Sequence, residues 1–221
     1  MDASTTFQNI PPDKQRRVLD EAQREFAGHG FQGASMNRLA TRLGIAKGSI
    51  FKYFGSKEGL FAAVFSGAVE LLSGSLRQAR DQTAGQPLAA RLEQLLLVGA
   101  DFATRHPDVY RIYLKMRFNQ DFPMRQAVLG QVQAMSARFL TAILEQAKAS
   151  GEVPRDLDTA LGVFLIDAAL DRYIQVRADA VSGRDAPGQD APDGAADLAA
   201  MLARALTRAD DTTLSGGSTH G

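Results

Sequence analysis

Two short apolar patterns joined by a glycine constrain the fold of this chain more than any other feature. The first follows Ser35, a residue type that commonly caps helix N-termini, and it recurs at the spacing of one helical face. Its apolar residues are Met36, Leu39, Ala40 and Leu43. Gly44 then ends the helix, because glycine adopts the left-handed conformation at little cost. A second short helix is predicted from about residue 46, with Ile50 and Phe54 on its buried face. The stretch 35–57 therefore predicts a helix-turn-helix.

The charge of the same stretch is one-sided. Between Phe31 and Lys57 there are five basic residues and no Asp or Glu, although the whole chain carries 25 Lys and Arg against 25 Asp and Glu. A helix-turn-helix whose second helix begins with small and basic residues suits the major groove of DNA. The alternative is a solvated basic face on an ordinary helical turn. Because turn spacing, apolar pattern and charge agree, we favour DNA binding.

The motifs of this region continue on both sides of the two helices. Gly30 and Phe31 precede them, and the segment 58–61 (Glu-Gly-Leu-Phe) follows Lys57. The most specific part is the run 46–54, Ala-Lys-Gly-Ser-Ile-Phe-Lys-Tyr-Phe, followed after Gly55 by Ser-Lys-Glu. Together these motifs resemble the N-terminal DNA-binding domain of the tetracycline-repressor (TetR) family of bacterial regulators. The resemblance covers roughly the first quarter of the chain, and the remainder agrees only in length and helical layout.

The second helix carries residue types that contact DNA. Lys47 and Lys52 are expected to meet phosphates, where a point charge suffices and the contact is sensitive to salt. Gly48 lets the backbone approach the duplex closely. Ser49 can reach a base edge, and Tyr53 can donate a hydrogen bond to a phosphate.

The family resemblance implies a fuller set of DNA contacts. The positions it points to are Lys47, Gly48, Ser49, Phe51, Lys52, Tyr53 and Lys57. Lys57 begins the next helix, whose N-terminus attracts anions, and Ser35 has the same place in the first helix. Phe51 stands where the family often has tyrosine, so it has no hydroxyl to offer a phosphate. Arg38 and Arg42 face away from the apolar stripe and are weaker candidates.

The rest of the chain predicts an all-α protein of about nine helices, since no segment shows the alternation of a strand. We expect a helix-turn-helix DNA-binding domain of three helices in residues 1–56, a helical-bundle ligand-binding and dimerisation domain in 57–210, and a disordered tail in 211–221. Residues 1–11 are predicted to be a mobile arm. A long apolar stripe from 60 to 76 predicts a rigid helix that joins the reading head to the second domain.

Large and flexible apolar side chains concentrate in the predicted second domain. They are Phe102, Tyr110, Tyr113, Met116, Phe118, Phe122, Met135, Phe139 and Phe164. Ligand pockets are mostly apolar with few polar groups, and methionine adapts to irregular shapes. Any one of these residues could equally be ordinary core. As a set they resemble the inducer-binding domain of the family, which implies a small, largely apolar or aromatic effector.

Two carboxylates interrupt the apolar face of the helix predicted over 159–181. Asp167 and Asp171 are four residues apart and could hold a cationic group of a ligand. They could also pair with Arg172 or Arg177, or flank the buried stripe and stay hydrated. A divalent metal and an enzymatic role are a further alternative, but two carboxylates on one helix are too few to indicate it.

Composition argues against several other classes of protein. The chain has no Cys, so it lacks disulfides, thiolate nucleophiles and Cys-ligated metals, which suits a reducing cytoplasm. Its three histidines, His29, His106 and His220, have no partner at metal-ligand spacing. We predict no metal, no cofactor and no enzymatic activity. No secretory signal or apolar run near the ~20 residues of a membrane span is evident, so no membrane partner is expected.

A single reading head contacts a short half-site, so we expect a homodimer on a palindromic operator in double-stranded DNA. The last two helices have small-residue faces that could form a four-helix interface, as the resemblance implies. The candidate interface residues are Ala168, Ala169, Leu198, Ala199, Leu202 and Ala205. The sequence thus predicts a ligand-responsive homodimeric transcriptional repressor, with a helical ligand-binding or scaffold protein that does not act on DNA as the alternative.

Overall fold

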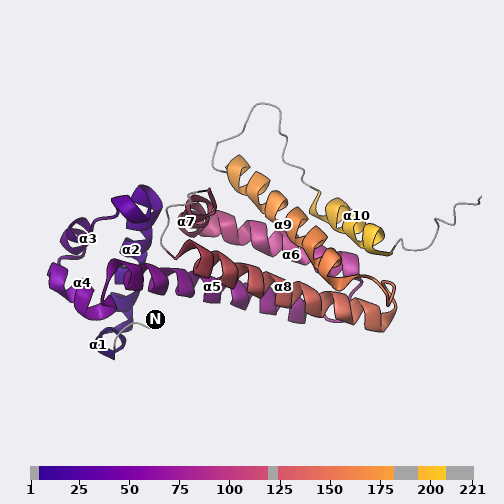
Figure 1. Ribbon diagram of the computed structural model, residues 1–221, viewed down its shortest axis with the longest axis horizontal. Helices are drawn as coiled ribbons and strands as arrows, with labels where there is room; N and C mark the ends of the chain where they lie inside the picture. Colours follow the sequence, from indigo (N-terminus) through magenta and orange to yellow (C-terminus); the bar gives the residue numbers. More distant parts are fainter. Residues whose placement is uncertain (1–4, 119–123, 182–193, 208–221) are drawn as a thin grey trace, which may run out of the picture.

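The computed structural model describes residues 5–118, 124–181 and 194–207. Figure 1 shows an elongated molecule in which α1 to α4 form a compact head at one end and the longer helices extend away from it. The described residues form ten helices and no strand: α1 Thr5–Gln8, α2 Pro12–Gly33, α3 Met36–Leu43, α4 Lys47–Phe54, α5 Lys57–Gln82, α6 Leu88–Arg105, α7 Pro107–Phe118, α8 Arg125–Ser150, α9 Thr159–Val181 and α10 Ala195–Thr207. The all-α prediction is confirmed.

The helix that was not predicted is α1. It lies within residues 1–11, which the sequence predicts to be a mobile arm, and that prediction is wrong for Thr5–Gln8. Phe7 is 3% exposed, and its ring lies 5.5 Å from Tyr53 and 4.6 Å from Phe54. One aromatic side chain therefore anchors this segment against the back of α4. The predicted tail in 211–221 lies outside the described residues.

The predicted helix-turn-helix is present in α3 and α4. The Ser35 side chain accepts a hydrogen bond from the Arg38 N–H, which caps α3. Gly44 has φ 67° and ψ 33°, so the left-handed conformation that ends α3 is the one that glycine adopts without a Cβ penalty. Ile50 and Phe54 of α4 are buried.

The junction between α4 and α5 is tight. Ser56 caps α5 by accepting a hydrogen bond from the Gly59 N–H at 3.0 Å. A Cβ on Gly59 would lie 2.0 Å from the carbonyl oxygen of Phe54, which no side chain could relieve because the obstacle is backbone. This close approach fixes the direction in which α5 leaves the reading head.

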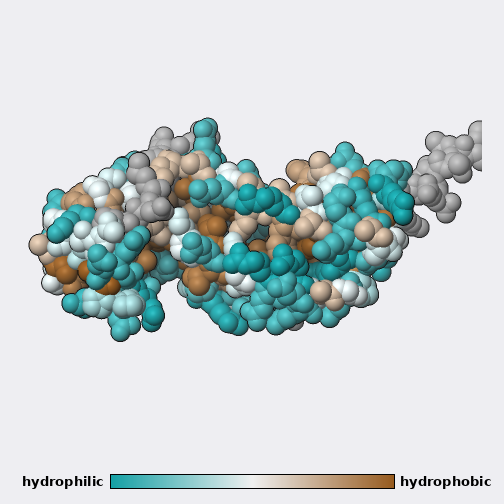
Figure 2. All heavy atoms as spheres, turned by 90° about the horizontal axis from the view of Figure 1, so that it is seen from below, coloured by the Kyte–Doolittle hydropathy of each residue, from teal (hydrophilic) through white to brown (hydrophobic). Residues whose placement is uncertain are grey.

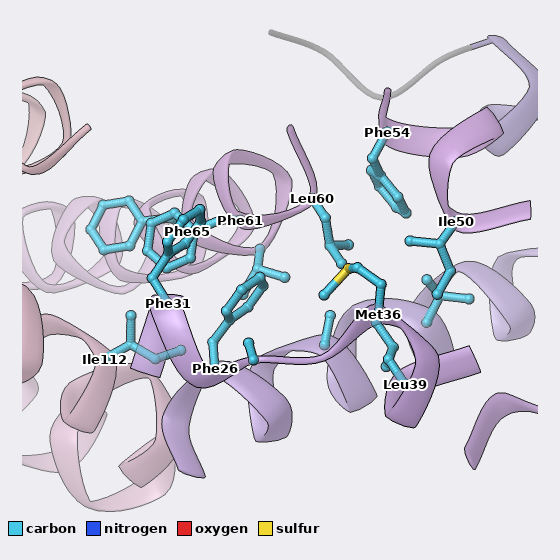
Figure 3. Packing of buried hydrophobic residues seen from close by; sticks show 14 of the residues in the cluster. Phe26, Phe31, Met36, Leu39, Ile50, Phe54, Leu60, Phe61, Phe65 and Ile112 are labelled. Atoms are coloured by element: carbon cyan, nitrogen blue, oxygen red, sulfur yellow. The ribbon is translucent and has the colours of Figure 1, made fainter. Parts of the chain in front are cut away.

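The buried residues form two apolar cores. The core of the head, which we call the head core, combines residues of α1 to α5 with Ile112 and Met116 of α7 and Val128 of α8. Figure 3 shows Phe61 of α5 against Phe26 and Phe31 of α2, with Ile112 beside them. The second core lies among α6, α8, α9 and α10 at the other end of the molecule.

Two helices are long and apolar enough to cross a membrane when judged by length and composition alone. They are α5 and α8, and the sequence analysis did not anticipate them. Core helices of soluble proteins pass the same test. Here α5 contributes Leu60, Phe61 and Phe65 to the head core, and α8 contributes Leu140 and Leu144 to the second core.

Replacing Phe7 by alanine should destabilise the head, because it removes a buried ring that touches two aromatic residues of α4. We expect a loss of about 3 kcal/mol in the free energy of unfolding, measured by urea denaturation followed by circular dichroism. Phe118→Ala is the matched control, because Phe118 is 71% exposed and its loss should cost little. Equal effects of the two substitutions would contradict the packing described for α1.

Candidate functional site

The outer face of α4 is where the predicted DNA-contacting residues gather. Lys47, Gly48, Phe51 and Lys52 are all exposed, and the Lys47 ammonium lies 5.8 Å from the centre of the Phe51 ring. Ser49 and Tyr53 are partly exposed on the same short helix. Because Phe51 is 38% exposed, it is a surface residue and not part of the head core.

The two predicted contacts at helix N-termini have intramolecular partners. Ser35 uses its side chain to cap α3, and Lys57 donates a hydrogen bond to the Gln32 carbonyl at 3.1 Å. The Lys57 ammonium also lies 4.9 Å from the centre of the Phe31 ring. These contacts hold the Lys57 charge at the surface beside the start of α5, where a phosphate could approach.

A buried carboxylate, which the sequence analysis missed, ties α3 to α2. The Glu25 side chain is fully buried, and it accepts hydrogen bonds from the Ser35 N–H at 2.8 Å, from Arg38 and from Arg42 at 2.8 Å. His29 Nδ1 lies 3.6 Å from the same carboxylate. Burial alone would raise the pKa of Glu25, but the hydrogen bonds from Arg38, Ser35 and Arg42 outweigh it and lower that pKa to about 2.

The Glu25 cluster changes how the basic residues of the head are interpreted. Arg38 and Arg42 both form ion pairs with Glu25, and Arg42 also contacts Glu21 at 3.1 Å. They therefore orient α3 on α2. Of the five basic residues between Phe31 and Lys57, Lys47 and Lys52 are the ones on the exposed face of α4.

The second site is a cavity of about 420 Å³ that opens to the surface and is lined by α5, α6, α7, α8 and α9. Eight of the ten ligand-binding residues predicted from sequence line it: Phe102, Tyr110, Tyr113, Met135, Phe139, Phe164, Asp167 and Asp171. Figure 2 shows apolar residues recessed between hydrophilic rims near the middle of the molecule. The cavity is thus a mostly apolar space next to the head.

Two predicted lining residues lie elsewhere. Met116 is fully buried in the head core, and Phe118 is 71% exposed at the end of α7. The reason is the helical period: Tyr110, Tyr113 and Arg117 share one face of α7, whereas Met116 lies on the face that packs on α2. Composition identified the helix but not the face. Phe122, another predicted member, lies outside the described residues.

The polar residues at one end of the cavity were largely missed. Arg117 forms an ion pair with Asp171, and the Ser136 hydroxyl donates a hydrogen bond to Asp167. Gln133 also lines the space. The position of Arg117, four residues after Tyr113 on one helix, was the signal that could have identified it.

Burial and nearby carboxylates raise the pKa values of the two tyrosines of α7. Burial, followed by the charges of Asp171 and Asp179, raises the pKa of Tyr110 far above its usual value. Burial and Asp171 also raise the pKa of Tyr113. Both phenols therefore stay protonated at neutral pH and can donate hydrogen bonds inside the cavity.

The carboxylates of the cavity do not form a metal site in the part of the chain that the structure describes. No group of three or more His, Cys, Asp or Glu residues is found there with metal-binding geometry. Asp171 is engaged with Arg117 and Asp167 with Ser136. This arrangement suits an organic ligand better than a divalent cation, which needs several oxygen ligands.

The fold thus presents a helix-turn-helix whose second helix, α4, has an exposed basic face. Residues 18–64 match the family described as bacterial regulatory proteins, tetR family. The transcriptional repressor AcnR of Corynebacterium glutamicum is 43% identical over 54 residues, which are 24% of this chain and 29% of AcnR. The transcriptional activator FasR of Mycolicibacterium smegmatis is 28% identical over 169 residues, 74% of each chain.

A solved structure extends the likeness to the whole fold. The transcriptional regulator FadR of Bacillus subtilis, in complex with stearoyl-CoA, superimposes with a TM-score of 0.61 at 17% identity, covering 89% of this chain and 99% of FadR. Residues 18–64, which form most of the head, are therefore similar in sequence to the tetR family of bacterial regulatory proteins. The matched region spans about 29% of the AcnR sequence, so the family assignment is carried mainly by the head.

Replacing Glu25 by glutamine should loosen α3 and flatten the acid dependence of stability. At pH 7 we expect a loss of about 2–3 kcal/mol, because Arg38 and Arg42 lose their charged partner. The pKa of Glu25 is lowered from 4.5 to about 2, so its contribution is present above about pH 5 and is lost as the pH falls toward 2. Urea denaturation from pH 7 to 2.5 measures both effects.

The matched control is Asp101→Asn, which removes one charge from an exposed pair with Arg105. It should change stability by less than about 0.5 kcal/mol. If the Glu25→Gln protein lost stability between pH 5 and 2.5 as steeply as the unmodified protein, the Glu25 cluster would not be the source of that acid dependence.

Proposed function

We propose that this chain is a ligand-responsive transcriptional repressor that acts in the cytoplasm as a homodimer. It binds double-stranded operator DNA through α4 and leaves it when a small, largely apolar molecule occupies the cavity. The observation that carries the proposal is the division of α4, which buries Ile50 and Phe54 and exposes Lys47, Gly48 and Lys52. In this proposal residues 1–56 are the DNA-binding domain and 57–210 the effector-binding and dimerisation domain.

The chemistry of α4 supports insertion into the major groove. Lys47 and Lys52 supply positive charge for phosphates, and no acidic residue lies between Phe31 and Lys57 to oppose it. Gly48 places bare backbone at the outer face, and Ser49 is the short polar residue that can contact a base edge. Tyr53 and Lys57 then serve the flanking phosphates.

Dimerisation is supported by apolar residues left exposed on the last two helices. They are Leu161, Phe164 and Leu165 of α9 and Met201 of α10, between 40% and 70% exposed. Exposed apolar patches of this kind mark interaction surfaces. Two of the predicted interface residues, Ala199 and Leu202, are instead buried within the subunit, in the second core. A two-fold dimer would present two heads to the half-sites of a palindromic operator.

The head and the cavity share one helix, which suggests how a ligand could act. One face of α7 lines the cavity with Tyr110, Tyr113 and Arg117, and an adjacent face enters the head core. From the same helix, Lys115 donates hydrogen bonds to the Ala27 carbonyl at 2.8 Å and to the Gly28 carbonyl at 3.1 Å. These carbonyls lie just before the break in α2 at Gly30, where φ is 67°.

We therefore propose that the effect of the ligand reaches the head through α7 together with α5, the helix predicted from sequence to join the head to the second domain. A ligand that fits one arrangement of α7 better than another shifts the population of head positions, and only this difference in affinity can do so. Release from DNA then follows if the favoured arrangement spaces the two heads wrongly. The coupling is reciprocal, so operator DNA weakens ligand binding by the same factor.

Replacing Lys47 by glutamate should abolish specific DNA binding without unfolding the protein, because it puts a negative charge against a phosphate. The measurement is fluorescence anisotropy with an operator obtained by selection from genomic DNA, across a salt series. Arg155→Glu is the matched control, since Arg155 is exposed in the α8–α9 connection at the end of the molecule opposite the head. Equal operator affinity of the Lys47→Glu and unmodified proteins would overturn the assignment of α4 as the reading helix.

Replacing Lys115 by methionine should weaken the response to effector more than the binding of effector. The variant keeps the cavity but loses two hydrogen bonds to α2, so the change in operator affinity caused by a saturating effector should fall well below the roughly 5–150-fold typical of allosteric proteins. Anisotropy and calorimetry measure the two quantities. Lys148→Met is the control, because Lys148 contacts Thr159 and Glu145 far from the head. If the effector changed operator affinity as much in Lys115→Met as in the unmodified protein, α7 would not carry the effect of the ligand to the head, and α5 would be the remaining route.

A further inference from the structure

The cavity has an uneven distribution of charge. Its walls are largely apolar, and three charged residues line it within the described part of the chain: Arg117, Asp167 and Asp171. All three lie on α7 and α9, so they gather on one side of the space. Two carboxylates against one guanidinium give the cavity a formal charge of about −1 at neutral pH.

The single cation of the cavity is already engaged. Arg117 is paired with Asp171, and this hydrogen bond is the largest cause of its raised pKa. Asp167, in contrast, is not paired with a cation within the part of the chain that the structure describes. Its carboxylate accepts a hydrogen bond from the neutral Ser136 hydroxyl. A carboxylate beside an apolar cavity with no ion-pair partner among the described residues favours a cation in that space.

The aromatic residues add a second attraction for a cation. The rings of Phe65, Phe102, Tyr110, Tyr113, Phe139 and Phe164 all line the cavity. The centres of the Tyr110 and Tyr113 rings lie 6.2 Å apart, with the ring planes inclined by 30°. The faces of aromatic rings attract ammonium groups, and the effect strengthens where water is excluded.

We propose that the effector of this protein is an organic cation with an apolar body. Its ammonium or quaternary ammonium group lies between Asp167, Asp171 and the tyrosine rings, and its apolar part fills the space between α5, α6 and α8. The volume of about 420 Å³ suits a molecule of this kind, since small-molecule sites run from roughly 300 to 1,000 Å³. The inference rests on the proposed function in one respect, that the cavity is the effector site.

The same geometry disfavours an anionic ligand. A carboxylate or phosphate placed at the polar end would face Asp167 and would have to displace Asp171 from Arg117. The described lining offers no other cation to receive it. Stearoyl-CoA, which FadR of Bacillus subtilis holds, belongs to this disfavoured class.

The test compares two ligands of equal chain length and opposite charge. Decyltrimethylammonium and decanoate, each below its micellar concentration, are titrated into the full-length protein by isothermal calorimetry, and stearoyl-CoA is titrated separately. We expect saturable binding of one decyltrimethylammonium per subunit, at least about 10-fold tighter than decanoate. Equal or tighter binding of decanoate or stearoyl-CoA, or no binding of the cation, overturns the proposal.

Substitutions in the cavity then test which carboxylate causes the preference for the cationic ligand. Asp167→Asn should weaken decyltrimethylammonium at least about 10-fold and leave decanoate unchanged or tighter, whereas Asp101→Asn, the same change outside the cavity, should alter neither. Asp167→Asn with Asp171→Asn should invert the preference, because Arg117 is then unopposed. Cation affinity that stays within two-fold in Asp167→Asn overturns the assignment. If the double variant fails to fold in a thermal melt, the single variant and the two-ligand comparison still decide.

Measuring operator affinity on the same preparations without ligand separates this inference from the proposed function. Cation-selective binding by a protein that does not bind DNA would support the inference and overturn the regulator. Operator binding with no preference for the cation would overturn this inference, and the proposed function as a transcriptional regulator would still hold.

Discussion

Phe61 of α5 packs edge-on against Phe26 and Phe31 of α2, with ring centres 5.1 and 5.7 Å apart, and most other features of the head depend on this contact. The head has too few residues to bury a core of its own, so it uses apolar residues from neighbouring helices. Ile112 and Met116 of α7 complete that core. Helices α5, α7 and α8 therefore contribute both to the head core and to the lining of the cavity, and the proposed coupling between the two sites relies on this shared burial.

Charge divides the same head into an internal and an external part. Glu25 forms ion pairs with both Arg38 and Arg42 and holds α3 against α2, so these charges serve the fold. Lys47 and Lys52 stay on the surface of α4, where charge can serve binding. A buried carboxylate with several donors costs desolvation but fixes orientation, and orientation is what a reading helix needs.

Much of the head could be predicted from sequence because its signals are local. The Ser35 cap, Gly44 and the spacing of Ile50 and Phe54 each depend on residues within one or two turns, and the structure confirms them. The all-α fold follows from the same helical period. What failed was any inference that needed a distant partner. Phe7 looked like part of a mobile arm because Tyr53 and Phe54, which bury it, are far along the chain.

The cavity likewise could be predicted only in part from sequence, because its lining depends on contacts between residues distant along the chain. Composition brought together eight residues that line it, but it could not separate Tyr113 from Met116, three residues apart on helix faces that meet different neighbours. The sequence by itself determined the helices, their caps and the basic run of α4, because these depend on spacing and residue type. The tertiary structure decided which side chains pair, namely Glu25 with two arginines and Arg117 with Asp171. It did so because burial and ion pairing depend on which helices lie side by side, and that is set by packing over the whole chain.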